Sequence, residues 1–177
     1  IKLAKKFSPV LLYPIFLLTK ETAAKTSDLE SLLWKDLNLK NRQLILKASK
    51  ELVDRKFEIS EELVNALSRI ERVSPFVFTN LEGNPIKKHI LNRELKRFQR
   101  KARIDTSWCL RDLRASFAAN FLRAGGTIKE LQKTLGHVRP YQTEETYGRF
   151  KVQNAGVLFD LAAVQETRAV STSVTKF

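Results

Sequence analysis

The last third of the chain carries the pattern that most restricts its fold. Leu110, Leu113, Phe117 and Phe121 recur at helical spacing, so their side chains form one apolar stripe. Gly125-Gly126 follows directly, and glycine is the residue at which helices most often end. The segment therefore predicts an amphipathic helix that packs one face against a core and then stops abruptly.

A second helix is predicted immediately afterwards. Thr127 and Glu130 have the spacing of a capping box, and Gly136 is a natural C-terminal stop. The apolar stripe between them consists of Ile128, Leu131 and Leu135. Two helices joined by a tight glycine turn are expected, with a further helix at 142–150 and another at 157–164.

Shorter elements are predicted upstream. The leucines from Leu29 to Leu37 have a helical spacing, and the predicted helix ends near Trp34. The runs 44–46 and 52–59 look like strands, and in the second run apolar residues such as Val53 and Phe57 alternate with charged ones. A helix follows from Ser60, and a basic helix is expected at 86–103. The predicted fold class is α+β, mainly helical, with the helices around a small antiparallel three-stranded sheet.

The charge of the chain points to an anionic partner. The 177 residues include 32 Lys or Arg against 19 Asp or Glu, a formal net charge of +13, while 43% hydrophobic residues suffice for a real core. Nucleic acid is the commonest polyanion for such a domain, and a basic protein that binds nothing is the alternative. Cys109, the one cysteine, permits no internal disulfide and is expected to be a small buried residue. No Cys/His spacing suits zinc, and no metal or cofactor is expected.

No membrane association is predicted. The longest apolar stretch, Val10–Leu18, contains Tyr13 and Pro14 and is too short to cross a bilayer. The chain starts at Ile and contains no Met, so it is interpreted as a piece of a longer protein.

Two arginines near the start of the 110–124 helix are candidates for anion binding. Arg111 and Arg114 lie three residues apart, beside the apolar stripe, so two guanidinium groups could converge on one phosphate. Two solvated arginines on a basic surface are the alternative.

The surroundings of these arginines resemble the catalytic domain of tyrosine recombinases, the phage-integrase family. The family's His-x-x-Arg-His-Thr-Phe-Ala is matched by residues 111–118, with Arg111 in the His place and Arg114 in the Arg place. Leu135-Gly136-His137 matches the family's Leu-Gly-His, and Tyr147 stands ten residues after that His, where the nucleophile is expected. Tyr141, four residues after it, fits less well.

The resemblance extends upstream. Residues 22–29 look like the family's Thr-Gly-x-Arg-x-Ser-Glu segment, which puts Lys25 in the place of the first catalytic Arg. The turn between the two predicted strands corresponds to the family's β2–β3 turn, where a catalytic Lys is expected. Lys50 is the nearest candidate and Lys47 the second.

The resemblance implies a mechanism. Tyr147 would attack the scissile phosphorus and form a 3′-phosphotyrosyl link, which conserves the bond energy so that strands rejoin without metal or ATP. Arg114 would bind the phosphate, His137 would hold or transfer a proton, and Lys50 would be the general acid. Lys25 would neutralise phosphate as a point charge.

Two departures from the family pattern leave a second reading open. Lys25 lacks the planar fork of an arginine, and Arg111 cannot transfer protons as a histidine can. A degenerate recombinase-like module that binds DNA with weak or lost cleavage is therefore the alternative. A type IB topoisomerase shares the chemistry but matches these motifs less well, and a helix-turn-helix regulator built on 110–136 leaves the upstream matches unexplained.

Double-stranded DNA and other recombinase protomers, in a synaptic tetramer, are the expected partners. Residues 157–164 could dock onto a neighbouring protomer or fold back on their own domain. The catalytic domain is expected at 1–165, with a flexible tail at 166–177, no N-terminal DNA-binding domain in this chain, and a cytoplasmic, nucleoid-associated location. The residues expected to contact DNA are Lys87, Lys88, Arg93, Lys96, Arg97 and Arg100.

Overall fold

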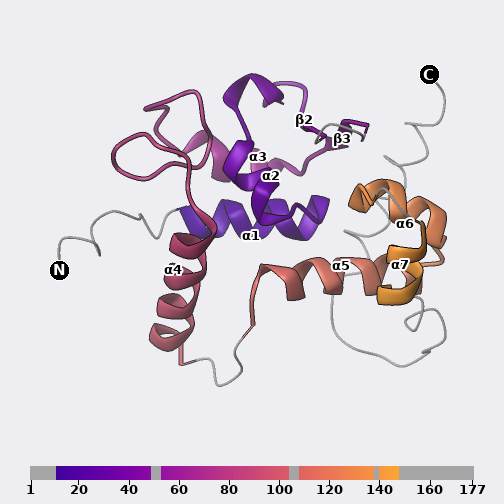
Figure 1. Cartoon of the computed structure of the whole chain (residues 1–177). Helices are drawn as coiled ribbons and strands as arrows, with labels where there is room; N and C mark the ends of the chain where they lie inside the picture. Colours follow the sequence, from indigo (N-terminus) through magenta and orange to yellow (C-terminus); the bar gives the residue numbers. More distant parts are fainter. Residues whose placement is uncertain (1–10, 49–52, 104–107, 138–139, 148–177) are drawn as a thin grey trace.

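The computed structural model describes residues 11–48, 53–103, 108–137 and 140–147. Helices dominate this part of the chain, and three short strands form one antiparallel sheet (Figure 1), as the sequence predicts. Lys50, the segment 157–164 and the tail at 166–177 lie outside the described residues.

The first hydrophobic core gathers around helix α1 (Leu12–Thr22). Ile15 and Leu18 of this helix are fully buried, and they belong to the same core as Leu63 and Leu67 of helix α3 (Glu61–Ser68). Ser60 caps α3 as predicted, since its hydroxyl accepts a hydrogen bond from the backbone N–H of Leu63 at 3.1 Å.

The sheet consists of β1 (Leu37–Asn38), β2 (Gln43–Leu46) and β3 (Arg55–Glu58), paired in that order. Leu44 of β2 lies opposite Phe57 of β3, and both side chains are buried. The predicted alternation of apolar, buried residues with charged, exposed ones in 52–59 is correct from Lys56 onward. Val53 departs from it, because it precedes the paired part of the strand and is 86% exposed.

The helix predicted from the leucine spacing after Leu29, with its end near Trp34, is wrong in its extent. Helix α2 (Thr26–Ser31) ends early because Leu32 is extended, and a single 3₁₀ turn, η3 (Trp34–Asp36), leads into β1. The backbone of Leu33 pairs instead with Phe76 in an isolated bridge. The leucine spacing arises because separate elements face the same core.

The basic segment forms helix α4 (Lys88–Lys101), close to the predicted bounds. Leu91 and Leu95 bury one face of this helix in the first core. Its other faces carry the basic side chains, so the helix is amphipathic in the sense that the sequence indicates.

A second core is built by helices α5 (Leu110–Arg123), α6 (Ile128–Leu135) and α7 (Pro140–Tyr147). Both predicted helix boundaries are confirmed: Thr127 and Glu130 form the capping box, and Gly136 ends α6 at a left-handed φ of 63°. Cys109, predicted to be buried, is exposed, because it is the cap residue that precedes α5 rather than a member of its apolar face.

The two cores meet where α5 runs alongside α1 (Figure 1). Ala23, just after α1, is fully buried and belongs to the second core rather than the first. The end of α1 therefore lies against the α5–α7 unit, and the candidate functional residues are found at this junction.

Candidate functional site

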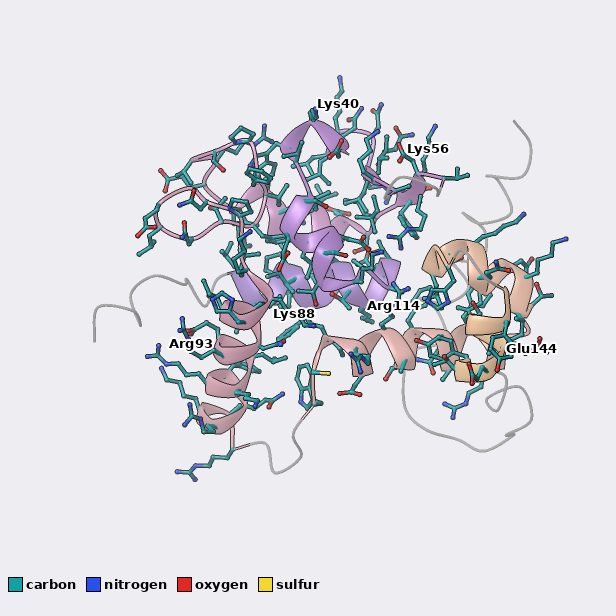
Figure 2. All side chains as sticks on the ribbon, in the orientation of Figure 1. Lys40, Lys56, Lys88, Arg93, Arg114 and Glu144 are labelled. Atoms are coloured by element: carbon teal, nitrogen blue, oxygen red, sulfur yellow. The ribbon has the colours of Figure 1, made fainter. Side chains whose placement is uncertain are left out.

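Arg114 occupies the centre of the junction between the two cores. It lies on α5 and is only 8% exposed. Its guanidinium donates one hydrogen bond to the carbonyl of Ala23, after α1, and another at 2.7 Å to the carbonyl of Leu135, at the end of α6. Figure 2 labels Arg114 at this point, where α1 approaches the α5–α7 unit. One buried side chain thus joins the C-terminal ends of two helices.

His137 lies beside Arg114, one residue after the glycine that ends α6. Its Nε2 is 3.1 Å from Nη2 of Arg114, and its Nδ1 is 2.7 Å from the hydroxyl of Thr143 on α7. An arginine can only donate, so Nε2 must be the acceptor and the ring proton must sit on Nδ1. The two partners therefore select a neutral imidazole with one defined tautomer.

The charge state of His137 agrees with this geometry. Its pKa is lowered from the ordinary 6.5 to about 4, first by burial and then by the positive charges of Arg114, Lys25 and Arg55. Nε2 is consequently free of a proton near neutral pH, and its lone pair accepts the hydrogen bond from Arg114.

Tyr147 completes the group from α7. Its side chain is 6% exposed and stacks on His137, with ring centroids 6.4 Å apart and planes 11° from parallel. Burial and the charge of Arg55 lower the pKa of Arg114, whereas the charge of Tyr147 and a hydrogen bond with its side chain raise it. The phenol is thus in direct contact with both the guanidinium and the imidazole.

Lys25 approaches the group from the start of α2. It is an exposed, extended cap residue whose backbone N–H donates to Oδ2 of Asp28 at 2.9 Å. Its charge contributes to the low pKa of His137. Of the six residues predicted as catalytic, Arg114, His137 and Tyr147 are in contact, and Lys25 acts electrostatically on His137.

The remaining predicted residues stand differently. Arg111 is exposed and lies about one helical turn before Arg114. Among the described residues, the cations that lower the pKa of His137 are Arg114, Lys25 and Arg55, and Arg111 is not one of them. Lys47 forms an exposed ion pair with Asp54 at 2.8 Å, which raises its pKa. Lys50 lies outside the described residues, so its role stays a prediction.

Sequence reasoning missed two residues at this site. Arg55 of β3 pairs with buried Asp28 at 2.7 Å and acts on both Arg114 and His137. Thr143 is fully buried and orients the His137 ring. No signal in the sequence marks Thr143, whose burial only the structure shows, and nothing local distinguishes Arg55 from its many basic neighbours.

The basic face of α4 lies at a distance from Arg114 along the molecule, as the labels of Lys88 and Arg93 in Figure 2 show. Arg93 and Arg97 both lie near Glu94, at 3.5 and 3.7 Å, but keep substantial exposure. The side chains predicted to contact DNA are exposed, except for the half-buried Arg97: Lys87, Lys88, Arg93, Lys96 and Arg100.

Two further properties concern the described part of the chain. No group of three or more His, Cys, Asp or Glu side chains there could hold a metal ion. None of its helices combines the length and the apolar character needed to cross a membrane.

Comparisons with known proteins identify the family. The model of the phage integrase family matches residues 2–153, so the chain belongs to that family. No curated protein sequence matches the chain.

Solved structures with the same fold are tyrosine recombinases. XerA recombinase aligns with a TM-score of 0.69 and 22% identity over 92% of this chain, and the Tn1549 transposon integrase, in complex with circular intermediate DNA, with 0.65 and 20% over 89%. The catalytic domain of bacteriophage HP1 integrase aligns with 0.60 and 22%, covering 86% of this chain and 83% of that one. The chain spans only 58% and 59% of the first two proteins.

The low pKa of His137 gives a pH prediction. An unfolded chain takes up a proton on this side chain near pH 6.5, whereas the folded protein does so only near 4. The free energy of unfolding should therefore decrease as the pH falls from about 6.5 to 4. NMR titration in a His89→Gln background, which leaves one imidazole, should give a midpoint near 4, and His137→Gln should remove this part of the pH dependence. A midpoint near 6.5 would contradict the lowered pKa of His137.

Arg114 is predicted to matter for stability as well as chemistry. Arg114→Ala leaves the carbonyls of Ala23 and Leu135 without this donor in a buried place, and should lower the free energy of unfolding by about 3 kcal/mol. Arg111→Ala, at an exposed position of the same helix, should cost less than about 0.5 kcal/mol. Urea denaturation measures both, and equal stability of the two variants would refute the role assigned to Arg114.

Proposed function

We propose that this chain is the catalytic part of a site-specific DNA recombinase or integrase that cuts and rejoins strands through Tyr147. The observation that carries the proposal is the contact between Arg114 of α5, Tyr147 of α7 and His137, which follows the end of α6. Their chemistry suits phosphoryl transfer, in which a protein mainly positions the phosphate and stabilises its charge. Membership of the family supports the same reaction class.

The proposed first step exchanges one phosphodiester for another. The Tyr147 oxygen bonds to the scissile phosphorus, the bond from phosphorus to the 5′-oxygen breaks, and the strand is held by a 3′-phosphotyrosyl link. The phenol loses a proton and the departing 5′-oxygen gains one. Because the new link conserves the energy of the old bond, the 5′-hydroxyl of a strand can reverse the reaction.

Each side chain has a distinct task in this step. A guanidinium has five N–H donors, and those of Arg114 face Ala23, Leu135, His137 and the Tyr147 side chain, so a phosphate oxygen bound by the fifth would lie next to the Tyr147 hydroxyl. His137, unprotonated at Nε2, can take the phenolic proton. Lys25 adds positive charge, and Lys50 is the proposed general acid for the 5′-oxygen.

Covalent trapping tests the nucleophile. Nicked duplexes with randomised sequence should yield a protein–DNA adduct that survives denaturation, because the strand beyond the nick diffuses away before it can rejoin. Tyr147→Phe should lower the adduct at least 10³-fold, since it removes the attacking oxygen. Sequencing the captured strands identifies a preferred site for later assays.

Tyr141→Phe is the matched control for this experiment. Tyr141 lies on the same helix but is 70% exposed, and its variant should trap as much adduct as the parent. Adduct formation by Tyr147→Phe at the level of the parent would disprove the proposed nucleophile.

The excess charge predicts a strong dependence of binding on salt. If about eight phosphates are neutralised, chiefly by α4, the logarithm of the association constant should fall with the logarithm of salt concentration at a slope near −7. Fluorescence anisotropy with a labelled duplex measures this slope, and Lys88→Gln or Arg93→Gln should each reduce it by about 1. A slope near −2 would show that α4 does not track the backbone.

The alternative is a degenerate module that binds DNA without efficient cleavage. The observation that favours it is Lys25, whose ammonium cannot clamp a phosphate as an arginine would. Lys25→Arg should raise the rate of adduct formation, up to about 10²-fold, if the site is an attenuated enzyme. Binding without adduct in both the parent and Lys25→Arg would establish the binding module instead.

A further inference from the structure

Arg55 is an unusual residue in its own strand. The strand β3 is short and mostly exposed, with Lys56 and Glu58 facing solvent, yet the side chain of Arg55 is only 9% exposed. Its Nη2 lies 2.7 Å from Oδ2 of Asp28, whose side chain is 4% exposed. Removing such a charged pair from water costs free energy, and a charge placed only to keep the protein soluble would stay on the surface. The buried position of the pair therefore suggests a specific role.

Asp28 connects Arg55 to the start of α2. The same Oδ2 that binds Arg55 also accepts the backbone N–H of Lys25 at 2.9 Å. This hydrogen bond holds the extended cap residue at the start of the helix. By fixing Asp28, Arg55 fixes the place from which the Lys25 side chain departs.

The other end of the guanidinium holds the end of α6. Nη1 of Arg55 donates to the carbonyl of Thr134 at 3.2 Å. A Cβ on Gly136 would come within 3.0 Å of Nε of Arg55, so the side chain lies directly against this glycine. The next residue is His137, and the preceding carbonyl, that of Leu135, binds Arg114.

We propose that Arg55 is a positioning residue for strand cleavage, which braces the start of α2 against the end of α6 and so sets Lys25 and His137 around the phosphate bound by Arg114. The inference rests on the proposed function for its catalytic consequence, whereas the brace itself is a property of the free protein. Arg55 contacts Asp28 and the end of α6, and it acts on the reacting atoms through them.

The charges that act on His137 come from three separate elements. Arg114 lies on α5, Lys25 at the start of α2 and Arg55 on β3, and Tyr147 stacks on the ring from α7. Each of the three cations lowers the pKa of His137. Removing Arg55 should therefore raise that pKa, which gives a readout that a purely structural role would leave unchanged.

Three variants test the brace. Arg55→Gln removes the charge, Arg55→Lys keeps the charge without the fork, and the double variant Arg55→Gln with Asp28→Asn leaves no buried unpaired carboxylate if the single variant fails to fold. Arg42→Gln is the matched control, because Arg42 forms an exposed ion pair with Glu58 at 2.6 Å beside the same strand. Each variant is assayed for duplex binding, adduct formation on the captured substrate and the NMR titration of His137.

The expected result separates positioning from binding. Arg55→Gln and the double variant should slow adduct formation by about 10²-fold with a change in duplex affinity below about threefold, and the pKa of His137 should rise. Arg55→Lys should lose about tenfold in rate while that pKa stays low. Arg42→Gln should match the parent throughout.

Two outcomes overturn the proposal: a double variant that forms adduct within about twofold of the parent rate, or an unchanged His137 titration in every folded Arg55 variant. If the parent itself forms no adduct, the proposed function fails. The titration of the free protein still decides the brace, because it requires no DNA and no catalysis.

Discussion

The arrangement of this domain depends on the burial of one guanidinium. Arg114 lies between two hydrophobic cores and donates to carbonyls at the ends of α1 and α6. Carbonyls at a helix C-terminus lack intrahelical partners and carry partial negative charge, so a cation there is stabilised while it satisfies them. The same hydrogen bonds orient the guanidinium, and the residue that joins the two cores is thereby held ready for an anion.

The positive charge of the junction favours the binding of an anion there. Arg114, Arg55 and Lys25 bring three positive charges to a partly buried place, and Asp28 is held by one of them. The neutral state of His137 limits this repulsion in the free protein, since a protonated imidazole would add a fourth charge. A phosphodiester would supply the missing negative charge, and its binding would raise the pKa of His137 and favour retention of a proton taken from the phenol.

Much of the fold was predictable because its signals are local. The apolar stripes and caps of α5 and α6 fix their boundaries within a few residues of sequence, and Gly136 confirms its role through a positive φ. The structure of the segment around Leu32 was not predictable in this way. Its leucines reach one core from the end of a helix, a 3₁₀ turn and a strand, and together their spacing resembles that of a single helix. The predicted burial of Cys109 was wrong because the residue type says little about burial at a helix cap.

Part of the candidate site was likewise predictable from the sequence and part was not. Arg114, His137 and Tyr147 were predictable from the resemblance to the phage-integrase family, because each stands at a matching position of the family's motifs. Arg55 was not, because its significance exists only when β3, α2 and α6 meet, 79 residues separating it from Thr134. A residue that carries such long-range contacts changes the interpretation of loss-of-function variants around it. Substituting Asp28 or Gly136 would disturb the proposed phosphate site through Arg55 although neither residue is assigned a part in the chemistry. Activity therefore has to be weighed against stability and the titration of His137 before a residue here is called catalytic.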